Sequence, residues 1–233
     1  MPLRRKLLKE SPSSPSPRGF SVLTRISEIV AEVDQELLVK EEIREKVLEL
    51  TRIAVRSSSQ AINSAHNGDL TTARKHLEKA REAVHQVNSL VEQHPDLKYS
   101  GLLNQAHQEF TEASVFIALL EGKDVPSPSE LGVMGALYLT GLADVIGELR
   151  RLCVDCLRRD DFQGAERAFK LMEEIYSALR YVDHPKALIP GLRQKCDSAR
   201  RMIEDTRGML TMVLQRIKLR DSINTLIRKL EES

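Results

Sequence analysis

The most constraining feature of the sequence is its first long segment, because Phe20 to His66 contains no proline and no glycine. Apolar residues recur along it at intervals of three and four: Val22, Ile26, Ile29, Val30, Val33, Leu37, Leu38, Ile43, Val47, Leu50, Ile53, Ala54 and Ala61. This period predicts one amphipathic α-helix. At ~1.5 Å per residue the helix would be on the order of 70 Å long.

Helix-breaking residues divide the rest of the chain into further helical segments. Asn67-Gly68 ends the first helix, and residues 122–128 form the clearest internal loop. We expect the later helices at about Asp69–Gln93, Tyr99–Glu121, Ser129 or Glu130 to Leu157, Asp160 or Asp161 to His184, and Pro190–Leu230. Aromatic residues make up only 4% of the chain and tryptophan is absent, which argues against a β-sandwich or barrel. The sequence therefore predicts an all-α bundle with long first and last helices, whose apolar stripes favour oligomerisation.

The first 19 residues differ in composition from the rest. Residues 11–19 carry three prolines and no apolar side chain, so we expect residues 1–19 to form a disordered basic tail and 20–233 a single helical domain. No apolar run approaches the ~18 residues of a membrane span, and the start lacks the apolar core of a secretory signal. Three cysteines favour a reducing, cytoplasmic setting, and a net charge of +1 excludes a histone-like polyelectrolyte.

Several residues could suggest catalysis but have simpler interpretations. Cys153 and Cys156 form a CxxC pair, but a zinc ribbon needs a second pair and Cys196 is alone. One helical turn apart, the two cysteines are expected to pack as small apolar groups. The six histidines are scattered, so we expect surface or capping roles for them. Phosphate-binding glycine loops and nucleophile elbows are absent.

Two pairs of carboxylates border apolar helix faces. Glu109 and Glu112 are one turn apart in one predicted helix, and Asp144 and Glu148 are spaced i and i+4 in the next. Small residues surround the second pair: Gly135, Ala136, Thr140, Gly141, Ala143 and Gly147. A glycine in the middle of a helix lowers helix stability by ~1 kcal/mol relative to alanine. Such glycines therefore usually permit the close approach of another group to the helix. If the two helices pack face to face, the four carboxylates converge.

A converged set of carboxylates repels itself unless hard cations neutralise it. Oxygen ligands of this kind select Mg²⁺ or Mn²⁺ over zinc. A metal held in this way suits phosphodiester cleavage, because it activates water and neutralises charge on the phosphate. The simpler alternative is that both pairs are exposed on solvated helix faces.

Three segments of the chain resemble the translin family. The most specific is Gly141-Leu-Ala-Asp-Val-Ile-Gly-Glu-Leu-Arg-Arg-Leu-Cys-Val-Asp-Cys156, followed by Asp160-Asp161. The others are Gln108-Glu-Phe-Thr-Glu-Ala-Ser-Val-Phe116 and Asp34-Gln-Glu-Leu-Leu-Val-Lys-Glu-Glu-Ile-Arg-Glu-Lys46. The resemblance extends from about residue 20 to the C-terminal helix. It implies a bundle of six or seven helices that assembles into a hollow octamer and binds single-stranded RNA and DNA inside it.

Two branches of that family differ in chemistry. The factor X branch is a Mg²⁺-dependent endoribonuclease that carries acidic residues in these motifs, and the translin branch replaces several of them. Glu109, Glu112, Asp144 and Glu148 match the complete acidic set, so the chain resembles the catalytic branch. It departs from that branch in its short 122–128 loop and in having Phe116-Ile117 where an aromatic–histidine pair is usual. The compact form suggests a prokaryotic homo-oligomer.

The sequence therefore favours a Mg²⁺-dependent endoribonuclease that cleaves single-stranded RNA, with the four carboxylates as metal ligands and catalytic residues. Arg150 and Arg151 are the candidates for phosphate contacts, with Arg158, Arg159, Arg200 and Arg201 as further candidates. Two alternatives remain open at this stage. One is a non-catalytic shell that binds single-stranded RNA or DNA, and the other is a helical scaffold for proteins.

Overall fold

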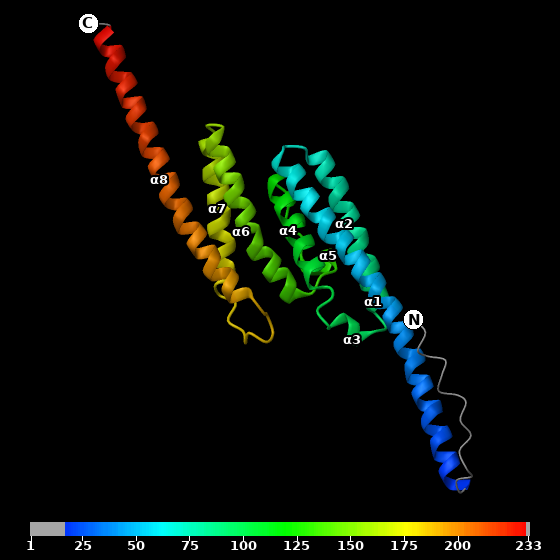
Figure 1. Cartoon of the computed structure of the whole chain (residues 1–233). Helices are drawn as coiled ribbons and strands as arrows, with labels where there is room; N and C mark the ends of the chain where they lie inside the picture. Colours follow the sequence, from blue (N-terminus) through cyan, green and yellow to red (C-terminus); the bar gives the residue numbers. More distant parts are fainter. Residues whose placement is uncertain (1–16, 232–233) are drawn as a thin grey trace, which may run out of the picture. The chain divides into compact units, whose positions relative to one another are not determined.

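The computed structural model describes residues 17–231, and these residues contain eight α-helices and no β-strand. The helices are α1 Pro17–His66, α2 Leu70–Val91, α3 Pro95–Lys98, α4 Asn104–Leu120, α5 Pro128–Leu131, α6 Gly135–Arg158, α7 Phe162–Leu179 and α8 Leu192–Glu231 (Figure 1). The expected all-α fold with long first and last helices is confirmed. Within the described residues no helix combines the length and apolar character needed to cross a membrane.

The chain divides into two compact units, and the boundary falls within α1, between Glu45 and Lys46. In the first unit, large apolar side chains of α1 are exposed: Val22, Leu23, Ile26, Ile29, Val30, Val33, Leu37, Leu38 and Val39. The helix begins at Pro17 rather than Phe20, because proline is well suited to the first helical turn, where no backbone donor is needed. Residues 17–19 of the expected tail are therefore helical, and residues 1–16 lie outside the described part.

The second unit contains the hydrophobic core. In this unit α6 lies between α4 on one side and α7 and α8 on the other (Figure 1). The core includes Phe116 of α4, Ile146 and Leu149 of α6, Met172 of α7 and Ile203 of α8, all of which are buried. Because α6 contributes side chains to contacts with three neighbours, its polar residues are positioned by the packing of the whole unit.

Three expected helices are shorter than the sequence suggested: α7 ends at Leu179 instead of near His184, and a glycine with positive φ explains each of the other two. The helix expected from Tyr99 begins at Asn104, because Gly101 has φ +91° and cannot continue a right-handed helix. The helix expected from about Ser129 is divided at Gly132, which has φ +66° and caps α5 at its C-terminus. The periodicity of apolar residues continues through both breaks, which is why it concealed them.

The interpretation of the CxxC pair as packing residues is confirmed. Cys153 and Cys156 are buried beside Ala165 and Ala168 of α7 and Leu210 of α8. Burial raises the pKa of Cys153 to about 11, so its thiol stays protonated at neutral pH. A protonated, buried thiol is neither a nucleophile nor a metal ligand.

The helices α4 and α6 approach each other closely at Gly141. A Cβ atom built there would lie 2.6 Å from the backbone oxygen of Gln108 and 2.8 Å from Cβ of Thr111. The expectation that the α6 glycines permit close approach is thus confirmed for Gly141. It is wrong for Gly135 and Gly147, where a Cβ would meet nothing within 4 Å.

We predict that Gly141→Ala lowers the free energy of unfolding by about 1–3 kcal/mol, because the methyl group overpacks the α4–α6 contact. Gly147→Ala is the matched control on the same helix, and it should raise the free energy of unfolding by up to ~1 kcal/mol. Urea denaturation of both variants measures the two changes. Equal effects of the two substitutions would show that the helices are not in close contact at Gly141.

Candidate functional site

The structure brings the four predicted carboxylates to one region between α4 and α6. Glu109 and Glu112 lie on α4, and Asp144 and Glu148 lie on α6, on the side that faces α4. A hydrogen bond crosses between the helices there, from Nε2 of Gln108 to Oδ2 of Asp144 at 2.7 Å. The close contact at Gly141 is one turn before Asp144, so it adjoins the acidic residues.

The acidic residues are close enough to change one another's ionisation. Burial, followed by the negative charges of Asp144, Glu109 and Glu148, raises the pKa of Glu112 to about 8. Burial and the charges of Asp144 and Glu148 also raise the pKa of Glu109. Without a bound cation, Glu112 therefore holds a proton at neutral pH. The positively charged side chains around the site do not neutralise all of its carboxylates.

Lys195 of α8 partly compensates this charge. Its ammonium nitrogen lies 2.5 Å from Oδ1 and 2.7 Å from Oδ2 of Asp144. The same lysine lowers the pKa of both Glu109 and Glu112, opposing the effects of burial and of the other carboxylates. Asp144 is therefore held on both oxygens by Lys195 and additionally on Oδ2 by Gln108.

Glu148 is held by a histidine at the C-terminal end of α1. Nε2 of His66 lies 2.6 Å from Oε2 of Glu148, and the His66 ring packs against Phe116 with ring centroids 4.8 Å apart. The His66 side chain is only 2% exposed. Among the described residues its Nδ1 has no hydrogen-bond partner, and it lies 4.0 Å from Oδ2 of Asp155. The expectation of surface or capping roles for the histidines is thus wrong for His66, which orients a site carboxylate, and also for His107 of α4, which is buried.

Arginines line a pocket that includes His66, the partner of Glu148. His66, Asn67 and Asp155 line it together with Arg151, Arg158 and Arg159. Nη1 of Arg151 lies 4.0 Å from Oε2 of Glu148 and 3.5 Å from Oδ1 of Asn63, both at the outer limit of an interaction. Its side chain is about half exposed, at 51%. A guanidinium with such loose partners is available to an anionic group that enters the pocket.

The other arginines suggested by the sequence lie elsewhere. Arg150 is two residues from Glu148, which places it about 200° around the α6 axis from that carboxylate. Arg200 lines a separate cavity between α7 and α8. Arg201 donates a hydrogen bond to Oγ of Ser198 at 3.2 Å. Of the six candidate arginines, Arg151 lies near Glu148, and Arg158 and Arg159 line the pocket that also includes His66.

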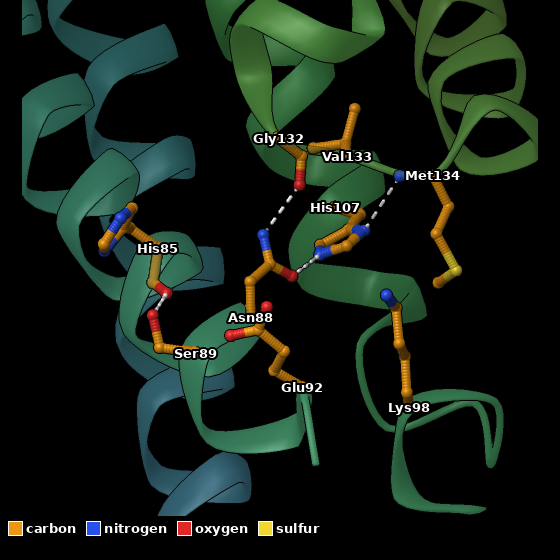
Figure 2. A pocket seen from close by; sticks show the side chains of 9 residues that line it. All are labelled: His85, Asn88, Ser89, Glu92, Lys98, His107, Gly132, Val133 and Met134. Atoms are coloured by element: carbon orange, nitrogen blue, oxygen red, sulfur yellow. Dashed lines mark hydrogen bonds between the residues drawn. The ribbon is translucent and has the colours of Figure 1, made fainter. Parts of the chain in front are cut away.

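A buried histidine fixes α4 in place just before the first acidic pair. The backbone N–H of Met134 donates to Nδ1 of His107 at 3.2 Å, and Nε2 of His107 lies 3.1 Å from Oδ1 of Asn88 (Figure 2). Asn88 in turn donates to the Gly132 carbonyl at 2.7 Å. Burial lowers the pKa of His107 to about 4, so the ring is neutral and donates through Nε2. The network ties α4 to α2 and to the start of α6, and it thereby sets the spacing of the acidic pairs.

The donor chemistry of the site fits a hard divalent cation. Four carboxylates supply oxygen ligands only, and the raised pKa values of Glu109 and Glu112 reflect negative charge that a cation would relieve. In the part of the chain that the structure describes, however, no three His, Cys, Asp or Glu side chains are already arranged to hold a metal ion together. Lys195 and Gln108 occupy the oxygens of Asp144, so a cation that uses this residue needs the side chains to rearrange.

Comparison with known proteins identifies the class to which this fold and site belong. The family model described as the translin family matches residues 24–206. The chain therefore belongs to the translin family, as its sequence motifs suggested. The match includes α2 to α7 and every acidic residue of the site.

Individual relatives agree with this assignment. An uncharacterized protein from Methanocaldococcus jannaschii is 34% identical over 187 residues, which cover 79% of this chain and 82% of the relative. Two solved structures superpose with a TM-score of 0.74 over 80% of this chain and 97% of the other: AfC3PO, 32% identical, and its complex with duplex RNA, 31% identical. Apo-NeC3PO, at 22% identity, has a TM-score of 0.72 over 86% of this chain and 100% of its own, and it supports the fold alone.

Three residues of the site were not predicted from the sequence. Gln108 could have been found, because it shares a helix face with Glu112 at i and i+4. His66 and Lys195 carry no comparable signal. They reach the site from α1 and α8, and only the packing of those helices against α4 and α6 brings them there.

We predict that the metal-free protein loses stability as the pH rises from about 4.5 to about 8. In this range the folded protein keeps a proton on Glu112 that the unfolded chain has released, so the free energy of unfolding falls with pH. The contribution is fully present below the lower pH and is lost above the higher one. Glu112→Gln removes this titration and should flatten the profile. Urea unfolding in a chelator, at fixed protein concentration, tests this, and superimposable profiles for the two proteins would contradict it.

Proposed function

We propose that the protein is a Mg²⁺-dependent endoribonuclease of the factor X type, which cleaves single-stranded RNA. The observation that carries this proposal is the complete set of four carboxylates on the facing sides of α4 and α6, with the pKa of Glu112 raised to about 8. The crowding of four carboxylates is unfavourable for folding, so a cation-binding role explains their presence better than a structural one.

The comparisons support RNA as the ligand. AfC3PO, which is similar to this chain over most of its length, has been solved in complex with duplex RNA. The pocket beside Glu148 offers three arginines to the phosphates of such a ligand. We propose a single-stranded substrate on the basis of the factor X motifs, so binding and cleavage are to be measured with both single-stranded and duplex RNA.

Each residue of the site has a distinct role in this proposal. Glu109, Glu112, Asp144 and Glu148 would hold the cation, which when bound supplies positive charge at the scissile phosphate and an acidified water. His66 fixes the orientation of Glu148 through its 2.6 Å contact. Asp144 is oriented from α4 by Gln108. The arginines position the strand by contacts to phosphate oxygens, which are independent of base sequence.

Two substitutions test the catalytic role of the carboxylates. Glu112→Gln and Asp144→Asn keep the side-chain shape but remove a negative charge, so Mg²⁺ binds more weakly and cleavage should fall by at least about a hundredfold. RNA binding should persist or become tighter, because a charge that repels phosphates is removed. Glu174→Gln, on the exposed face of α7 where it pairs only with Lys170, is the matched control and should cleave at the wild-type rate.

Cleavage of labelled RNA and binding at two salt concentrations measure these effects. Wild-type cleavage by a folded Glu112→Gln or Asp144→Asn protein would contradict the assignment of the site.

A second function is favoured by the Lys195–Asp144 contact, which occupies one of the carboxylates. Intact RNA binding by the wild type without cleavage in either Mg²⁺ or Mn²⁺ would identify the protein as a non-catalytic RNA-binding shell.

We also propose that the protein acts as a closed oligomer, an octamer by resemblance to the family. The exposed stripe of α1 between Val22 and Val39 is too apolar for a stable solvent-exposed surface, and self-association would bury it. Val30→Glu, in the middle of the stripe, should therefore reduce the mass measured by light scattering, whereas Glu28→Gln should leave it unchanged. A monodisperse wild-type monomer at micromolar concentration would contradict the proposal.

A further inference from the structure

The contact between Lys195 and Asp144 has features that an ordinary surface ion pair lacks. Lys195 reaches from α8 into the region between α4 and α6, and its ammonium approaches both oxygens of one carboxylate. The two side chains are only 28% and 25% exposed. A partly buried pair of this kind is screened less by water than a pair on an exposed helix face.

The position of the Lys195 ammonium is more informative than the strength of its ion pair with Asp144. Asp144 is the carboxylate whose charge, after burial, contributes most to the raised pKa of Glu109 and of Glu112. Lys195 therefore neutralises the most influential charge of the acidic site. Because it also engages both oxygens of Asp144, it stands where a divalent cation would find its ligand.

We propose that Lys195 is a built-in counter-cation, which holds Asp144 while the site contains no metal and leaves Asp144 when a divalent cation binds. This inference rests on the proposed metal site and adds a regulatory element to it. The ammonium of Lys195 and a divalent cation at the same carboxylate repel each other, and Lys195 and Gln108 together already make three hydrogen bonds to Asp144. The lysine therefore stabilises the empty site and raises the metal concentration at which the site fills.

The structure leaves space for the displaced ammonium. A cavity beside Asp144 and Lys195 is lined by Gly191, Gln194 and Ser198, which include polar side chains able to accept its hydrogen bonds. The four-carbon stem of lysine rotates readily into such a space. The exchange needs only a side-chain movement and no rearrangement of α8.

The first test compares the affinity for Mn²⁺ alone in Lys195→Met and wild-type protein, with free Mn²⁺ measured by electron paramagnetic resonance. Removing a positive charge next to the site should tighten Mn²⁺ binding roughly tenfold, because the competing charge lies only a few ångströms from the metal position. Lys170→Met, in an exposed i,i+4 pair on α7, is the matched control and should bind Mn²⁺ as the wild type does. A purely structural lysine would change the melting temperature of the variant without tightening Mn²⁺ binding.

The second test needs no variant, so it holds even if Lys195→Met fails to fold. Lysine amines of the full-length protein are acetylated with and without Mg²⁺ and quantified by mass spectrometry. Lys195 should react several-fold faster with Mg²⁺ because its ammonium has left Asp144, whereas Lys170 should react at the same rate in both conditions. Unchanged labelling of Lys195 at saturating Mg²⁺ would overturn the proposal.

The outcomes separate this proposal from the proposed function. If the wild type binds Mn²⁺ and cleaves RNA, but neither the affinity of Lys195→Met nor the labelling of Lys195 changes, the counter-cation role is wrong and the nuclease remains. If neither protein binds Mn²⁺ or Mg²⁺, the metal site itself is wrong and both proposals fail.

Discussion

The close contact of α4 with α6 is the constraint on which the candidate site depends. Only a glycine fits at position 141, where an added Cβ would lie 2.6 Å from the backbone oxygen of Gln108. Buried residues of both helices, such as Phe116 and Ile146, hold this arrangement. The hydrogen-bonded His107 fixes α4 against α2 and the start of α6. Apolar packing and the absence of a side chain at Gly141 thus bring together carboxylates that would otherwise move apart.

The electrostatics of the site follow from that packing. Carboxylates placed at a half-buried helix interface lose hydration and repel one another, and the protein responds in three ways. Glu112 retains its proton to about pH 8, Lys195 neutralises Asp144, and His66 holds Glu148. The first two responses reduce the negative charge of the site in the absence of metal, and the third orients Glu148 by a polar contact. A divalent cation could replace all three, which connects the stability of the empty site to its capacity for binding metal.

Much of this arrangement could be predicted from the sequence, because it depends on local patterns. The apolar period indicated α1 over nearly its full length, and the acidic pairs, Gly141 and the family resemblance indicated the candidate site. The breaks at Gly101 and Gly132 were missed, since backbone conformation at a glycine leaves no trace in apolar periodicity. His66 and Lys195 were missed for another reason: they reach the site through tertiary packing of helices that are distant in sequence, and an isolated histidine or lysine carries no signal of that packing.

The proposed function requires that the carboxylates of α4 and α6 bind a divalent cation together. The most direct test is a crystal structure of the protein grown with Mn²⁺, with anomalous scattering used to locate the ion. We expect an anomalous peak between the two helices, within ligand distance of at least three of Glu109, Glu112, Asp144 and Glu148. We also expect that the ammonium of Lys195 has moved away from Asp144 in that structure. An empty site at saturating Mn²⁺, with Lys195 still bound to Asp144, would contradict both expectations.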